Sequence, residues 1–414
     1  MNTILNISVP NFARSKLFVT SIMLNATGGG LVMAFMMVYF SRTTSISLAT
    51  IGLFITLGRA LSSIVPLFIG RLLDRIGPRK LSVLGDLISG IGFILCIFAR
   101  DPITIMLTQF ATQAGSHIFW TCNRGLVSLA SKGKGTQTWF GLIASLRNIG
   151  LGLGTVISSL AFTDGTNTVL HYVVFASSCL YFCSCIFLSL WHPQEEHVAQ
   201  LNATAHQRKN TTLKSIWADQ NYRGLLIVNF GLVLSAMVIP LVIVIYATEQ
   251  LGLPAVFSGG LVILNTAIVA IFSTHVASWT KSCNPVHNIK WGYLLNLLSF
   301  VIFWAAGYFA NMIIPACTLL VTGMLLFSIA EMISTPSANM LSIELSPAVN
   351  NGNYMAAFQM TWSVGMTIAP AIFGALLDSN KHSTWILLIL ATSTLAFYGF
   401  STFKRQVNEY SSQK

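Results

Sequence analysis

Three charged side chains lie deep inside long apolar runs, and they are the first candidates for chemistry. They are Arg59, Arg147 and Glu331. An ionisable residue costs roughly 2.5–3.5 kcal/mol at the centre of a membrane-spanning helix on insertion scales, so its presence there suggests a role. A desolvated carboxylate can exchange a proton or meet a cation, and a guanidinium can bind an anionic group. We therefore assign all three to a substrate or proton pathway, with a structural ion pair or a helix-packing hydrogen bond as the alternative.

A second group of candidates lies along the apolar run at 102–129. Gln109, Gln113, His117 and Trp120 recur at three- or four-residue spacing, which predicts that they share one face of a helix. Such a face would line a polar cavity that has one aromatic wall. His117 could titrate near neutral pH, although a histidine that merely packs is equally consistent with the pattern.

Two further charges lie nearer to the predicted helix ends. Asp86 falls about two turns into an apolar run that begins at the basic turn of residues 70–80. We expect it to pair with a basic residue of that turn. Arg124 lies near the end of its run, and we expect its long side chain to reach the membrane surface.

Four residues are assigned to helix packing. Gly150 and Gly154 follow Arg147 at a four-residue spacing that lets two helices approach closely. The pattern is common in membrane helices and weakly specific. Gly365 and Pro370 lie in a corresponding run of the second half of the chain.

The composition predicts an all-α integral membrane protein. The 414 residues are 54% hydrophobic and 8% charged, whereas soluble proteins contain about 25% charged residues. A span needs about 20 apolar residues, and the runs lack the two-residue alternation of a membrane β-barrel. Twelve runs qualify as transmembrane helices, at roughly 16–40, 45–70, 79–99, 102–129, 138–162, 168–191, 223–247, 254–279, 290–310, 313–340, 351–377 and 383–403.

A weak repeat divides the chain into two pseudo-symmetric bundles of six helices. A shift of 215 residues lays Gly150 on Gly365, and a shift of 207 residues lays Pro78 on Pro285. Same-direction repeats of this kind are typical of one class of transporter fold. The pattern alone is suggestive only.

The longest polar stretch supplies the domain boundaries. It covers residues 192–222 and predicts a cytoplasmic linker, with a short amphipathic helix near Leu213–Trp217. The bundles are then 1–191 and 223–414, the second with a short cytoplasmic tail.

The basic residues predict that both termini are cytoplasmic. With the amino terminus inside, 17 of the 23 Lys and Arg fall on the inner side and three, Arg42, Arg100 and Lys381, on the outer side. Such a bias sets membrane orientation. The net charge of +11 therefore reflects topology, not binding to nucleic acid. The seven cysteines and the histidines show no spacing that suits a metal, so we expect neither a metal nor a cofactor.

The basic turn after the second run, GRLLDRIGPRK, carries a recognisable motif. Its pattern is Gly-x-x-x-Asp-Arg-x-Gly-x-Arg-Lys, on Gly70, Asp74, Arg75, Gly77, Arg79 and Lys80. The segment resembles the signature loop between the second and third helices of the major facilitator superfamily. The resemblance implies two six-helix bundles around a central cavity, and a loop that latches the bundles together while the cavity faces outward. A simple anchor of topology is the alternative.

A second segment extends the resemblance over essentially the whole chain. The stretch AEMISTPSANM at 330–340, followed by Gly352, Tyr354, Trp362, Gly365 and Pro370, resembles the drug and metabolite exporters of the superfamily, a branch of proton antiporters. Two features depart from that branch. Gln109 stands where many members carry Arg, and the fifth helix lacks the Gly-Pro pair that accompanies its glycines.

The resemblance implies secondary active transport by alternating access, with export of a small amphipathic organic molecule against inward proton flow. Its partners would be that molecule, protons and membrane lipid, with no nucleic acid. We expect a monomer in the inner membrane of a bacterium. An importer of a small metabolite and a non-transporting membrane sensor remain open. An enzyme is disfavoured, because no phosphate-binding loop, His-Glu-x-x-His or Gly-x-Ser-x-Gly stretch occurs.

Overall fold

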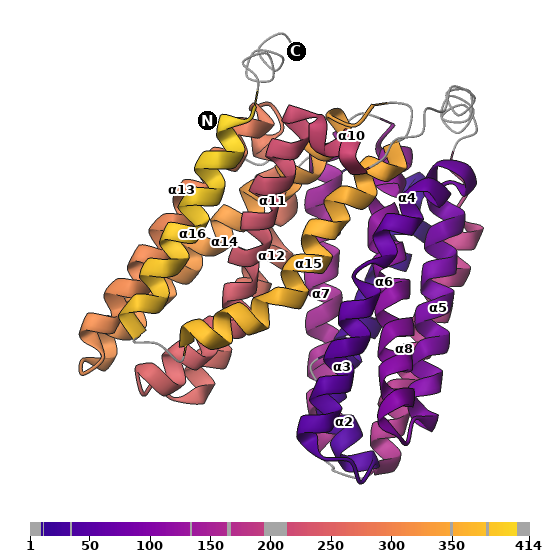
Figure 1. Ribbon diagram of the computed structural model, residues 1–414, viewed down its shortest axis with the longest axis horizontal. Coiled ribbons are helices and arrows are strands. Elements are labelled where there is room, and N and C mark those ends of the chain that lie inside the picture. Colours follow the sequence, from indigo (N-terminus) through magenta and orange to yellow (C-terminus); the bar gives the residue numbers. More distant parts are fainter. Residues whose placement is uncertain are drawn as a thin grey trace.

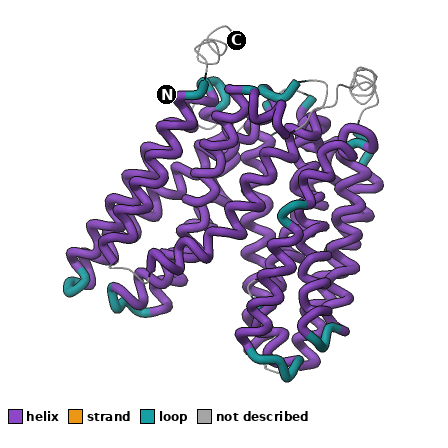
Figure 2. Tube along the Cα trace, viewed as in Figure 1, coloured by secondary structure: helices purple, strands orange, loops and turns teal. Residues whose placement is uncertain are grey.

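The computed structural model describes residues 10, 12–33, 35–132, 135–163, 167–193, 213–347, 351–377 and 381–403. Within these residues the chain is almost wholly helical and contains no strand (Figure 2). Two groups of helices stand side by side, one in indigo to magenta and one in salmon to yellow (Figure 1). We call them the N-half and the C-half.

The N-half contains six spans. The predicted runs 16–40 and 45–70 are each divided into two helices, and the other four are single helices. The bounds are α1 (Lys16–Met33), α2 (Met36–Thr43), α3 (Leu48–Ser62), α4 (Val65–Ile76), α5 (Pro78–Phe98), α6 (Pro102–Ser131), α7 (Thr136–Thr163) and α8 (Asn167–Leu190).

The C-half contains the other six spans, preceded by a short helix α10 (Leu213–Ala218) where the amphipathic helix was predicted. Residues 194–212 lie outside the described residues, so the linker itself remains a prediction. The spans are α11 (Gln220–Val238) with its π-helical continuation η3 (Ile239–Ile243) and η4 (Tyr246–Gln250), α12 (Ala255–Thr280), α13 (Pro285–Ala306) with η5 (Gly307–Phe309), α14 (Ile313–Glu344), α15 (Asn351–Leu377) and α16 (Lys381–Ser401).

Among the described residues, eight helices are long and apolar enough to cross a membrane on their own, and the pair α1–α2 would make a ninth. With α6, α15 and the shorter α16, the arrangement has the twelve predicted spans. The protein is therefore an all-α integral membrane protein of two six-helix bundles.

Local sequence signals explain where several spans begin. Asp101 caps α6, where its carboxylate accepts hydrogen bonds from the backbone N–H groups of Ile103 and Thr104. The hydrogen bonds from Thr104 also hold the pKa of Asp101 below its usual value. Proline occupies the first position of α5 and α13, where its missing N–H costs no helical hydrogen bond.

The two halves repeat a packing detail as well as a topology. A methyl group built on Gly85 of α5 would lie 2.7 Å from the carbonyl oxygen of Gly115 on α6. A methyl group on Gly292 of α13 would lie 3.1 Å from the carbonyl oxygen of Ala330 on α14. The two glycines are related by the 207-residue shift, and their partners by the 215-residue shift. The same close helix crossing is thus built twice, as a parallel repeat requires.

The halves meet near one end of the spans, which we call the closed face; it is the end at which α4 stops and α15 starts. There α15 contacts α4 and α6, and α7 contacts α12 and α14. Residues 137–143 of α7 are all buried, whereas within 153–160 only Gly154 and Ser158 are buried. The first half of α7 is therefore packed on every side, and its second half mainly on α1. The ribbons of the two halves diverge accordingly away from the closed face (Figure 1); the opposite end is the open face.

The four packing residues lie on α7 and α15. A methyl group on Gly150 would lie 2.7 Å from the Ala26 side chain, and one on Gly154 would lie 2.7 Å from the Leu31 nitrogen, so both glycines sit against α1. Gly365 packs against Val233 of α11. Pro370 lies inside α15 and is exposed.

Substitution of Gly154 by Ala is expected to destabilise the N-half by about 1–3 kcal/mol, because the added methyl group would overlap the α1 backbone. The effect is measured as the melting temperature in detergent, with size-exclusion chromatography as the readout of how much protein remains folded after heating. Gly259→Ala on α12 is the matched control, since a methyl group there meets no atom within 4 Å. Equal melting temperatures for the two variants would contradict close α1–α7 packing at Gly154.

Candidate functional site

An arginine and a carboxylate from opposite halves form the centre of the candidate site. Arg147 of α7 and Glu331 of α14 interact electrostatically. Asn265 of α12 donates from Nδ2 to Glu331 Oε2 at 3.3 Å and to Ser328 Oγ at 3.0 Å. The hydrogen bond from Asn265 orients the Glu331 carboxylate within the C-half, and Arg147 lies across from it on the N-half.

Two tryptophans enclose the arginine. The Arg147 Cζ lies 4.9 Å from the centroid of the Trp120 ring and 5.9 Å from that of Trp362. Both distances are within the range of a cation–π interaction. Trp120 comes from α6 and Trp362 from α15, so each half supplies one ring. We call Trp120, Arg147, Asn265, Glu331 and Trp362 the central cluster.

The central cluster lies about halfway across the membrane. Trp120, Arg147 and Trp362 are each about 11 residues from the closed-face end of their helix, or about 16 Å at 1.5 Å per residue. The hydrocarbon layer is about 30 Å thick. All five side chains are half-buried. A site at mid-depth with partly accessible charges and rings can bind an amphipathic molecule, and its carboxylate can take up or release a proton.

The closed face carries the motif of the basic turn. The Asp74 Oδ1 accepts a hydrogen bond of 2.7 Å from the backbone N–H of Gly352, at the start of α15. A carboxylate at a helix N-terminus is favoured by the helix dipole. Gly70 permits this approach, because a methyl group there would lie 2.9 Å from the Asn353 Cα. Gly77, at φ +87°, makes the turn into α5, a backbone conformation that suits glycine.

The basic residues of the turn have different surroundings. Arg79 donates from Nη1 to the Trp191 carbonyl oxygen at 2.6 Å and so ties the turn to the end of α8. Arg75 and Lys80 are exposed. Their positions suit anchors of membrane orientation, whereas Gly70 and Asp74 shape the contact with α15 and Gly77 shapes the turn into α5.

A series of polar contacts joins the halves from the closed face to the depth of the central cluster. Each pairs a residue of α6 or α7 with a residue of α12, α14 or α15. They are Gln137 Nε2 to Thr280 Oγ1 at 2.8 Å and to Ser337 Oγ at 3.3 Å, Arg124 Nη1 and Nη2 to Gln359 Oε1 at 3.4 Å, Ser145 Oγ with Thr274 Oγ1 at 3.1 Å, and His117 Nδ1 with Ser363 Oγ at 3.0 Å. Movement of one half against the other must break these bonds.

Three of the expectations from sequence are wrong. Arg124 does not reach the membrane surface; it is buried and its Cζ lies 4.2 Å from the Phe358 ring. Asp86 does not pair with the basic turn. It is buried inside the N-half, where Asn25 donates to it at 2.7 Å and Ser184 at 2.6 Å. Gln109 does not line an opening, because it is buried with its Nε2 3.9 Å from the Cys96 Sγ. In each case a neighbouring helix covers the side chain.

The remaining candidates lie elsewhere in the N-half. Arg59 is half-buried on α3, and its Nε is buried without a hydrogen-bond partner. Gln113 is half-buried on α6. Asn265 and Ser328 were missed by the sequence reasoning, because a single Asn or Ser in an apolar run has no pattern to distinguish it. Within the described residues, no group of three or more His, Cys, Asp or Glu could hold a metal ion.

The fold and the mid-depth site define a membrane transporter, and comparison with known proteins identifies the family. Residues 18–370 match the Major Facilitator Superfamily, and the chain belongs to it. Multidrug resistance protein MdtH of Salmonella paratyphi B is 20% identical over 346 residues, covering 81% of this chain and 79% of MdtH. The uncharacterized MFS-type transporter YttB of Bacillus subtilis is 22% identical over 404 residues, covering 92% and 94%. The outward-conformation crystal structure of the transporter FucP matches with a TM-score of 0.68 and 14% identity, over 94% of this chain and 98% of FucP.

Substitution of Gln359 by Glu is expected to slow transport about tenfold. The new carboxylate would pair with Arg124 across the halves, and about 1.4 kcal/mol of added stability in one state corresponds to a factor of ten. Flux in vesicles containing equal amounts of protein measures the effect. Gln359→Met, similar in size but uncharged, is the control and should not slow transport. Equal rates for the two variants would show that the halves do not separate at this pair.

Proposed function

We propose that this protein exports a small amphipathic, aromatic organic molecule from the cytoplasm in exchange for protons. One observation carries the proposal: Arg147 and Glu331 lie on opposite halves at mid-depth, close enough to interact electrostatically, and Trp120 and Trp362 flank the arginine. The two rings suit a flat apolar substrate, and the carboxylate suits a proton carrier. The name of the relative MdtH, a multidrug resistance protein, supports export.

We propose that the closed face is cytoplasmic and that the membrane is the inner membrane of a bacterium. The basic turn of residues 70–80 lies at the closed face, as do Lys132, Lys281 and Lys290. Arg42, in the last turn of α2, and Arg100, between α5 and α6, lie at the open face. Basic residues gather on the cytoplasmic side of membrane proteins. In this orientation the halves are joined toward the cytoplasm and diverge toward the outside.

The proposed cycle makes proton and substrate compete for Glu331. With the open face outward, a proton from outside binds the Glu331 carboxylate, removes its charge and weakens its attraction to Arg147 and to the bound molecule. The substrate then leaves to the outside. After the halves rock to the opposite arrangement, the proton passes to the cytoplasm and substrate binds the restored carboxylate. One proton enters for each turn in which a molecule leaves.

Asp74 has a mechanical role in this proposal. Its hydrogen bond to the Gly352 N–H ties α4 to α15, and this contact must break when the closed face opens. The residues around it therefore act as a latch for the outward-facing state. The turn would also keep its orienting function through Arg75, Arg79 and Lys80.

The test is proton movement in inverted membrane vesicles. The vesicles are energised, a panel of aromatic cations and neutral aromatic compounds is added, and the proton gradient is followed with a fluorescent dye. Collapse of the gradient by some compounds, absent from vesicles without the protein, supports export coupled to protons. Collapse only in right-side-out vesicles would indicate an importer. Absence of any transport with a broad panel, in either orientation, would favour a sensor.

A further inference from the structure

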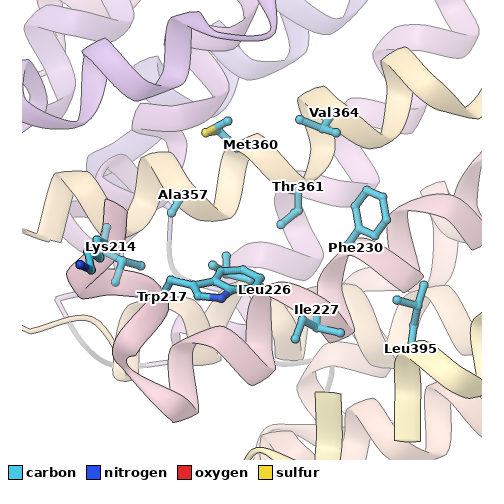
Figure 3. Close-up of a pocket in the computed structure, with 11 residues that line it drawn as sticks. Lys214, Trp217, Leu226, Ile227, Phe230, Ala357, Met360, Thr361, Val364 and Leu395 are labelled. Atoms are coloured by element: carbon cyan, nitrogen blue, oxygen red, sulfur yellow. The ribbon is translucent and has the colours of Figure 1, made fainter. Parts of the chain in front are cut away.

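An apolar cavity of about 610 Å³ lies in the C-half (Figure 3), and none of the five central-cluster residues lines it. Its walls come from α10, α11, α15 and α16, with Leu226, Ile227 and Phe230 on α11 and Val364 on α15. The hydroxyl of Thr361 in its wall is already engaged, because it donates to the Phe358 carbonyl oxygen and accepts from Asn229 Nδ2. The surface that remains is apolar. We call this cavity the lateral groove.

The lateral groove lies on the outer side of α15. A helix turns by about 100° per residue, which places Ala357, Thr361 and Val364 within about 60° of one another on one face of α15 and Trp362 about 100–160° from each of them. Trp362 faces Arg147 in the central cluster. The groove therefore lies on a different face of α15 from the one that carries Trp362, and we infer that an occupant enters it from the bilayer.

A basic, aromatic segment closes one end of the lateral groove. Lys214 and Trp217 of α10 line it there, and both are exposed. Arg223 lies one turn before Leu226 and Ile227 on the same face of α11, and its Nη1 donates to the Trp217 carbonyl oxygen at 3.3 Å. Lysine, arginine and tryptophan at the end of an apolar surface are typical of the level of the lipid headgroups.

We propose that the lateral groove binds an anionic phospholipid of the bilayer. One acyl chain lies along Ile227, Phe230 and Val364, and the phosphate lies beside Lys214. The length of the apolar wall, its direction toward the membrane and the positive charge at only one end all match this occupant. Basic pockets between transmembrane helices on the cytoplasmic side are known places for acidic headgroups.

Binding in the lateral groove would act on the helix that carries the closing contact. The groove lies between α11 and α15, and α15 begins at Gly352, which donates to Asp74. A lipid wedged along this helix would stabilise its present position. The lipid site does not depend on the proposed substrate or on the direction of transport.

Native mass spectrometry of the purified full chain tests the proposal. The protein in a neutral detergent is titrated with palmitoyl-oleoyl phosphatidylglycerol or with the matching phosphatidylcholine. We expect one phosphatidylglycerol to bind more tightly than phosphatidylcholine. Lys214→Gln should weaken it about fivefold, the effect of about 1 kcal/mol for one basic residue near an anionic surface, and leave phosphatidylcholine unchanged. Lys290→Gln, an exposed lysine on α13 outside the groove, is the control and should bind as the wild type does.

A second variant tests the apolar part. Val364→Phe fills the lateral groove and should weaken binding of both lipids at least tenfold, while thermal unfolding checks that the variant is folded. The proposal is overturned if the wild type does not distinguish the two headgroups, or if Lys214→Gln and Lys290→Gln have equal effects. Tight binding of oleate without tight binding of phosphatidylglycerol would identify a free fatty acid as the occupant and also overturn it.

Discussion

Glu331→Gln is expected to abolish compound-driven proton movement while the protein remains folded in the membrane. Glutamine keeps the size of the side chain and an oxygen that can accept from Asn265, but it cannot ionise. The proposed exchange then has no proton carrier, so proton flux in inverted vesicles should fall at least about 100-fold. The dependence of any remaining transport on external pH should also disappear.

The control for this prediction is the same substitution at the end of the same helix. Glu344 lies at the closed-face end of α14, and its side chain is exposed. Glu344→Gln should leave both the flux and its pH dependence as in the wild type. If Glu331→Gln transports with an unchanged pH profile, Glu331 is removed from the proton pathway. The hydrogen bond from Asn265 to Glu331 would then serve only to hold α12 against α14.

Asp74→Asn is expected to slow transport about tenfold without reducing the amount of protein in the membrane. The amide can still accept from the Gly352 N–H, but it loses the charge that the N-terminus of α15 favours. The outward-facing state, which this bond stabilises and from which the substrate leaves, is then populated less, so its formation becomes the slow step. Such a charge contributes about 0.3–1 kcal/mol when exposed and up to about 2 kcal/mol when partly buried. Because Arg75, Arg79 and Lys80 remain, membrane orientation should not change. Flux and the level of inserted protein are measured together.

The matched control is Asp101→Asn at the open face. Asp101 also accepts backbone hydrogen bonds at the start of a helix, and asparagine caps helices about as well as aspartate does. This variant should transport normally. A normal rate in Asp74→Asn would reject the latch and leave the basic turn with orientation as its only role.

The positions of the helices could be predicted from the local pattern of hydrophobic residues. Apolar runs long enough to span a membrane predicted all twelve, and the predicted run 351–377 has the bounds of α15. The two largest errors in bounds are at α4, which ends at Ile76 instead of 70, and at α13, which begins at Pro285 instead of 290, where the Asn284 cap and the proline are the start signals. The breaks between α1 and α2, and between α3 and α4, have no signal in hydrophobicity, because both sides of each break are equally apolar.

Three of the five members of the central cluster were predicted from the sequence, but their grouping was not. Trp120, Arg147 and Glu331 were chosen because charges and polar faces are costly in lipid, a property of each residue by itself. Their meeting depends on how α6, α7 and α14 are placed beside one another, and 184 residues separate Arg147 from Glu331. Asn265 and Trp362 complete the site from two further helices.

The sequence by itself determined that this chain spans a membrane with twelve helices, because burial of the backbone in lipid requires long helices of apolar residues. It also determined which side chains are too costly to lie in lipid without a partner. Only the tertiary structure decided which partner each one has. Spacing along a helix shows which residues share a face, but not which neighbour covers that face. Asp86 and Gln109 are therefore buried inside the N-half, whereas Arg147 and Glu331 interact electrostatically across the halves.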